Sequence, residues 1–197
     1  DGDLTIKDAE YIATSGVGSR TFRFDNDNNI SLTLLNVTIR LNTASDSNYV
    51  FLFDIDTTGD IRIIDSEINA THYRTSTIKL QGSEVLIRNS TIWSGTLNGD
   101  AGNACREVYT EDNSNCAGYG RYTRSYLTLD ANNLTIEDSV LKATSEMTST
   151  EANYWYSNSG YWRYYWRAAW TYVDVDVEYD MNIDGSLILG YVFNAGP

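Results

Sequence analysis

The chain has 197 residues, a formal net charge of −13 and a sequence pI of about 4.3, with no apolar run long enough to span a membrane as a helix. An acidic surface repels phosphate groups, so this charge argues against nucleic acid as a partner and against insertion into membranes. Only three lysines stand among many Asp, Asn, Ser, Thr and Tyr residues, a composition typical of an extracellular, cell-surface protein.

A short motif recurs along the chain, with an apolar residue at its first, third and eighth places and Asn, Asp or Gly at its fifth. Short alternating segments precede the later copies, at 21–25, 50–56, 76–80, 125–130 and 173–178, and polar turn residues separate each from its copy. The predicted unit is therefore strand, turn, strand, bend and short strand. The six copies begin at Leu4, Leu32, Ile61, Val85, Leu134 and Met181.

The fifth place of the motif predicts a fixed backbone corner. Asp and Asn tolerate a left-handed conformation better than other non-glycine residues, and Gly adopts it without strain. Because Gly185 replaces Asn or Asp in the last copy, backbone conformation explains this place better than side-chain chemistry does. The predicted corner residues are Asp8, Asn36, Asp65, Asn89, Asp138 and Gly185.

The third and eighth places predict two inward-facing columns of stacked apolar side chains. The column from the third place contains Ile6, Leu34, Ile63, Ile87, Ile136 and Ile183. The column from the eighth place contains Tyr11, Ile39, Ile68, Ile92, Leu141 and Ile188. Stacking of similar side chains from copy to copy is the usual core of a repeat protein.

The first three gaps between copies are 28, 29 and 24 residues, and the last two are 49 and 47. A regular coil of this length with a corner in each coil resembles the right-handed parallel β-helix, the pectin-lyase-like architecture. The expected fold is all-β, a β-helix of about six coils in one domain over 1–197, and the long gaps predict insertions at 94–124 and 145–172. A β-sandwich is the alternative fold, although its strands need not repeat one corner motif.

The first insertion contains both cysteines of the chain, Cys105 and Cys116. No metal-site partners surround them, so we expect a local disulfide in an oxidising compartment. Two free thiols in a loop and a bond between subunits are the alternatives. The loop itself is either a stapled surface loop or a contact toward a neighbour or ligand.

The second insertion is rich in Trp and Tyr and predicts a hairpin, because SNSG separates two aromatic runs. Three roles remain open for it: a cover for the open side of its own fold, a subunit interface, or a platform for sugar rings. The candidate interface or ligand residues are Tyr154, Trp155, Tyr156, Tyr161, Trp162, Arg163, Tyr164, Tyr165, Trp166, Arg167 and Trp170.

The sequence offers no catalytic motif, phosphate loop or established metal-ligand spacing. The single histidine, His72, follows a motif copy in a polar stretch and is expected to be exposed. No cofactor is expected, apart from a structural calcium ion for which Asp54, Asp56 and Asp60 are weak candidates. Glycosylation sequons make Asn29, Asn69 and Asn133 candidate sites for glycans.

Stacked coils end in unpaired strand edges, and the sequence shows no amphipathic helix to cap them. We therefore expect an extracellular structural subunit that self-assembles with copies of itself into a filament, tube, sheath or surface layer. It loosely resembles archaeal or bacterial cell-surface assemblies and is not expected to be an enzyme. The alternatives are a carbohydrate-binding or adhesin module with glycans as partners and, third, a polysaccharide lyase or hydrolase.

Overall fold

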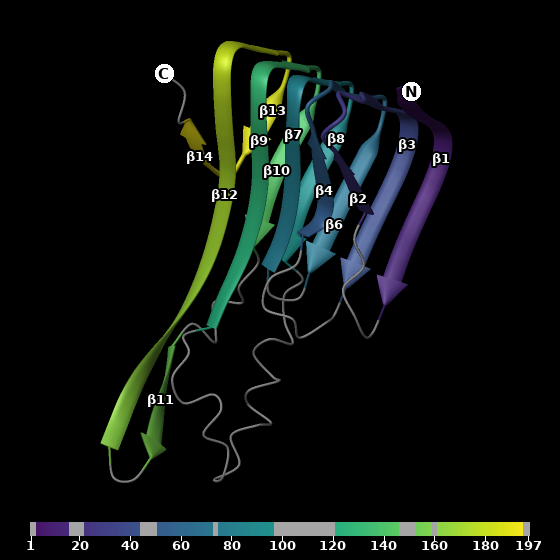
Figure 1. Cartoon of the computed structure of the whole chain (residues 1–197). Coiled ribbons are helices and arrows are strands. Elements are labelled where there is room, and N and C mark those ends of the chain that lie inside the picture. The colour runs from purple at the N-terminus through teal and green to yellow at the C-terminus, as the bar shows by residue number, and fades with distance from the viewer. Residues whose placement is uncertain are drawn as a thin grey trace.

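The computed structural model describes residues 3–15, 22–43, 51–72, 75–96, 121–145, 153–158 and 161–194. Within these ranges the chain is all-β, with no helix, and its strands belong largely to one long parallel sheet (Figure 1). The described part therefore contains no helix that could cross a membrane. The strands are β1 (Leu4–Ser15), β2 (Phe22–Asn26), β3 (Leu32–Thr43), β4 (Phe51–Thr57), β5 (Ile61–Ile64), β6 (Glu67–His72), β7 (Thr75–Arg88), β8 (Thr91–Thr96), β9 (Arg121–Glu137), β10 (Val140–Ser145), β11 (Asn153–Asn158), β12 (Tyr161–Asp184), β13 (Leu187–Leu189) and β14 (Tyr191–Asn194).

Each motif copy pairs in parallel with the copy before and after it. The strand segments before the corner form a first stack through β1, β3, β5, β7, β9 and β12, with Leu4 aligned on Leu32 and Met181 on Leu134. The segments after the corner form a second stack through β1, β3, β6, β8, β10 and β13. The register is thus the one that the repeated motif defines.

The alternating segments that precede the motif form a third stack, through β2, β4, β7, β9, β12 and β14. Two of the expected turns, at 27–31 and 58–60, interrupt the strands, whereas β7, β9 and β12 run on through the turns expected before the last three copies. In β7 and β9 the pairing skips only Ser83 and Asn132, so the backbone ladder is almost continuous through this bend.

The inward side chains of all three stacks form one hydrophobic core. In the four middle copies both predicted columns are confirmed, with every member at most 1% exposed. At the ends, Tyr11 and Ile183 are 43% and 42% exposed, while Ile6 and Ile188 are partly buried against the core. The difference follows from position, because an end copy has a neighbour on only one side.

Candidate functional site

The corner residues all have the left-handed backbone conformation that the repeat predicts. Their φ angles lie between 46° and 56°, including the φ of 56° at Gly185. Two further described residues have a positive φ outside the motif: Asn29, in the turn before the second copy, with 56°, and Gly190, after the last copy, with 149°. A Cβ on Gly185 would collide with Oδ1 of Asp138, so glycine also avoids a steric clash there.

Asp and Asn alternate along the row of corners, and hydrogen bonds join them in pairs. Nδ2 of Asn36 donates to Oδ1 of Asp8 at 2.8 Å, and Nδ2 of Asn89 donates to Oδ1 of Asp65 at 2.7 Å. Because an amide or glycine follows each carboxylate, no two carboxylates are neighbours in this row. The alternation therefore limits like-charge repulsion between successive copies.

A row of serines follows the corners and holds neighbouring copies together. Oγ of Ser90 donates to the carbonyl of Arg88 at 2.7 Å and accepts the backbone N–H of Ser66 at 3.0 Å. Ser66, Ser139 and Ser186 make the same two kinds of bond, each accepting the N–H at the sixth place of the preceding copy. The sequence shows Ser at this sixth place in four of six copies, but this recurrence alone does not predict which group the hydroxyl contacts.

The two outer edges of the stacks carry the exposed large apolar side chains. We call the open side of the first copy (Leu4–Ser15) the leading edge and the open side of the last copy (179–189) the trailing edge. Within the described residues, every exposed large hydrophobic side chain belongs to one of these edges. They are Leu4, Tyr11 and Ile12 on the leading edge and Tyr179, Met181, Ile183, Leu187 and Leu189 on the trailing edge.

Carboxylates gather on the outer face of the third stack. Asp25, Asp56, Gln81, Asp130 and Asp176 form one row across neighbouring strands, and Asp54 and Lys79 belong to the row beside it. Burial raises the pKa of Asp54. The pKa of Asp130 is also raised, mainly by burial and to a smaller extent by repulsion from Asp176. A polysaccharide lyase or hydrolase would need acidic and basic side chains clustered on one outer face, and here Nζ of Lys79 already forms an ion pair with Asp56 at 2.8 Å.

The three calcium candidates are each bound by a basic side chain. Asp54 lies 3.4 Å from Arg23, Asp56 lies 2.8 Å from Lys79, and Asp60 lies 3.0 Å from Arg62. No group of three or more metal-ligating side chains occurs in the part of the chain that the structure describes. The carboxylates here thus act as ion-pair partners across and along the strands.

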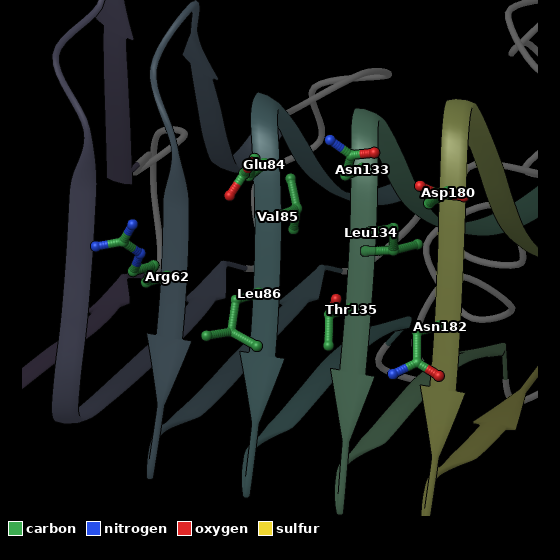
Figure 2. A pocket seen from close by; sticks show the side chains of 9 residues that line it. All are labelled: Arg62, Glu84, Val85, Leu86, Asn133, Leu134, Thr135, Asp180 and Asn182. Carbon is green, nitrogen blue, oxygen red and sulfur yellow. The ribbon is translucent and has the colours of Figure 1, made fainter.

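An open groove of about 500 Å³ follows the outer face of the first stack (Figure 2). Arg62, Leu86, Thr135 and Asn182 are register neighbours on successive strands and line it. Glu84, Asn133 and Asp180 line its other side, while Val85, Leu86 and Leu134 give it an apolar share, so the groove is of mixed polarity. It extends to Asn182 on the trailing edge.

The aromatic insertion contains a hairpin, in which β11 pairs antiparallel with the beginning of β12 from Asn153↔Trp166 to Asn158↔Tyr161. Figure 1 shows this hairpin reaching beyond the ends of the other strands. The side chains of 153–170 lie outside the described residues, as do both cysteines, Cys105 and Cys116, in the first insertion. The contacts expected of these residues stay predictions.

The expectation for His72 is wrong, because its side chain is 0% exposed. Burial alternates along the first part of β6, but Ala70, Thr71 and His72 at its end are all buried, as are Ser94, Gly95 and Thr96 at the end of β8. Both faces of these strand ends are covered, which strict alternation does not predict. Among the glycan candidates, Asn29 is exposed, whereas Asn69 and Asn133 are half-buried.

Comparison of the chain with protein-family models, curated proteins and solved structures found no match. The all-β architecture and its long parallel sheet are compatible with a β-helix-like fold. Any functional conclusion therefore depends on the geometry of the edges, the groove and the acidic face.

Proposed function

We propose that this chain is an extracellular structural subunit that self-assembles through the edges of its stacks into a filament, tube, sheath or surface layer. We further propose that the fold is a right-handed parallel β-helix of about six coils. The observation that supports self-assembly is the confinement of exposed large apolar side chains to the leading and trailing edges.

Unpaired strand edges favour pairing with another chain, and monomeric proteins block them with charges, bulges, prolines or covering elements. Here β1 pairs only with β3, and β13 pairs only with β10, among the described strands. Each edge therefore offers backbone donors and acceptors beside apolar side chains. Burying such side chains between subunits contributes roughly 25 cal/mol for each Å² removed from water.

Electron microscopy and sedimentation over a range of protein concentrations test the proposal. We expect regular polymers from the unmodified chain and folded monomers from Ile183→Lys, because a buried lysine at the junction would be desolvated without a partner. Thr91→Lys adds the same charge to the outer face of a middle copy and serves as the control, which should polymerise. Folded monomers of the unmodified chain at every concentration would refute self-assembly.

A carbohydrate-binding module is the second candidate, and the groove favours it. Amide, carboxylate and hydroxyl groups from Asn133, Asp180 and Thr135 line this groove and could form hydrogen bonds with sugar hydroxyl groups. A glycan array probed with the chain and with Thr135→Trp, which would fill the groove, tests it. Binding that the variant retains would contradict a site in the groove.

A further inference from the structure

We propose that molecules stack head to tail, with the leading edge of one copy on the trailing edge of the next, in the register that the internal repeat already uses. This inference rests on the proposed self-assembly and adds the partner, a second copy of this chain, and the order of residues at the junction. Two features of the edges support it, their apolar side chains and their corner residues, and one opposite-charge contact, Lys7 with Asp184, adds to them.

The apolar side chains of the two edges match at the first, third and eighth places of the motif, whereas Leu187 on the trailing edge would face Glu10. We extend the internal register by one copy, so that the first copy of the next molecule pairs with the last copy of this one. Each place of the motif on the leading edge then lies beside the same place of the motif on the trailing edge. Each column of the core would thereby continue across the junction. The resulting pairs are Leu4 with Met181, Ile6 with Ile183, and Tyr11 with Ile188.

One outward-facing row carries this match beyond the core. Register neighbours in the second stack form the row Ile12, Arg40, Asn69, Trp93, Lys142 and Leu189. Its two aliphatic members are its two ends, and Ile12 and Leu189 are 53% and 44% exposed. In a head-to-tail stack these two side chains become neighbours and cover each other, while the charged and polar members stay within each molecule.

The charges of the edges are complementary at one place and opposed at another. Glu137 and Asp184 are register neighbours, so two carboxylates lie side by side at the trailing edge. Across the junction, Lys7 of the next molecule would lie beside Asp184. Asp3 would meet Asp180, which opposes association. Oδ1 of Asp3 accepts the backbone N–H of Ser31 at 3.1 Å, which stabilises the charged carboxylate, so this repulsion remains.

The corner row also continues. Asp8 would follow Gly185, so the alternation of a carboxylate with an uncharged residue is kept and no two corner carboxylates meet. The serine row does not continue, because the sixth place of the first copy is Ala9, which cannot accept the N–H of Ser186. The junction therefore depends on backbone pairing, the apolar columns and Lys7.

Pairing of two identical edges is the competing arrangement. A twofold axis would make the two strands at such a junction antiparallel, whereas every pairing within the three stacks is parallel. It would also leave Lys7 away from Asp184. Head-to-tail contacts are heterologous and generate open fibres, as the proposed filament requires.

Cysteines placed at Ile12 and Leu189 distinguish the two arrangements. Neighbouring strands lie about 4.8 Å apart, within the range that a disulfide spans. We expect a mixture of I12C and L189C molecules, oxidised after polymerisation, to give 12–189 links, and neither variant alone to give links between identical positions. Native Cys105 and Cys116 stay in place, and the linked peptides are identified by mass after proteolysis.

Three outcomes separate the inference from the function on which it rests. Links of 12–189 support the head-to-tail register. Polymers that give 12–12 or 189–189 links, or no link at these positions, overturn the register and leave self-assembly intact. A folded protein that forms no polymer overturns both.

A charge exchange provides a second measurement that does not need cysteine. Lys7→Glu or Asp184→Lys alone should raise the critical concentration for assembly by about two- to fivefold, the size expected of an exposed ion pair, and the double exchange should restore it. High salt should reduce the difference. A double variant that assembles no better than either single variant would contradict the contact.

Discussion

Replacing Ser90 by alanine tests whether the serine row stabilises the stack. Ser90 is 4% exposed, and its Oγ accepts the backbone N–H of Ser66 at 3.0 Å and donates to the carbonyl of Arg88 at 2.7 Å. The Arg88 carbonyl also accepts the N–H of Asp65 at 3.0 Å, so it keeps one partner in the variant. The N–H of Ser66 loses the acceptor that the hydroxyl supplies inside the molecule.

One buried donor without an acceptor costs about 1–3 kcal/mol, so the free energy of unfolding should fall by that amount. Ser186→Ala is the matched control, because Ser186 makes the same bonds on the trailing edge but is only half-buried. Water can replace its hydroxyl there, and we expect a loss of about 0.5 kcal/mol or less.

Urea unfolding followed by circular dichroism measures both variants, in an Ile183→Lys background so that assembly does not contribute to stability. The midpoint should fall clearly for Ser90→Ala and little for Ser186→Ala, with equal denaturant slopes. A loss at Ser90 no larger than that at Ser186 would refute the claim that the buried serines hold neighbouring copies together.

Two further changes test the corners and the acidic face. Asn89→Ala should be less stable in urea than Asn89→Gly by about 1–2 kcal/mol, because both lose the bond to Asp65 but only alanine is strained at positive φ; equal stabilities would contradict this. Asp130→Asn should stabilise the fold by about 0.2–1 kcal/mol near neutral pH, because it removes a carboxylate whose charged form is disfavoured first by burial and second by repulsion from Asp176. Because the pKa of Asp130 is higher in the folded state than in the unfolded state, ionisation of its carboxyl destabilises the fold as pH rises through the folded pKa. The stability gained by Asp130→Asn should therefore vanish below about pH 3.9, where the carboxyl is protonated in both the folded and the unfolded state. Asp56→Asn, which breaks the bond to Lys79, should give no such gain, and a gain at Asp130 that persists in acid would contradict the electrostatic cause.

The apolar columns and the corners could be predicted from the sequence because each is a property of one residue in its local backbone. An isoleucine at a fixed place of a repeated strand faces inward in every copy, and Asn or Asp at a bend reports a positive φ. The serine row could not be predicted from one residue and its local backbone, because each Oγ accepts the backbone N–H of a residue in the preceding copy. Recurrence of Ser66, Ser90 and Ser139 at one place was the available signal, but the serine pattern alone does not identify the acceptor geometry.

The acidic face and the burial of His72 depend on contacts between segments that are distant in sequence. Asp130 is the register neighbour of Gln81 on one side and of Asp176 on the other, and each insertion lies between two of these residues. Composition shows that carboxylates are abundant but not which strands bring them together. The exposure predicted for His72 failed for a related reason, because the covering of a strand end depends on its neighbours.

The groove gives a further reason to connect the edges with function. It follows the outer face of the first stack and reaches the trailing edge at Asp180 and Asn182. In the proposed head-to-tail register Asp3 and Thr5 of the next molecule would lie beyond these two residues, so the groove would continue along the assembly instead of ending at each subunit. A glycan held there would then contact successive subunits, and its apparent affinity would rise with polymer length through multivalency. Binding that is equally tight for Ile183→Lys monomers and for polymers would show that the groove acts within single molecules.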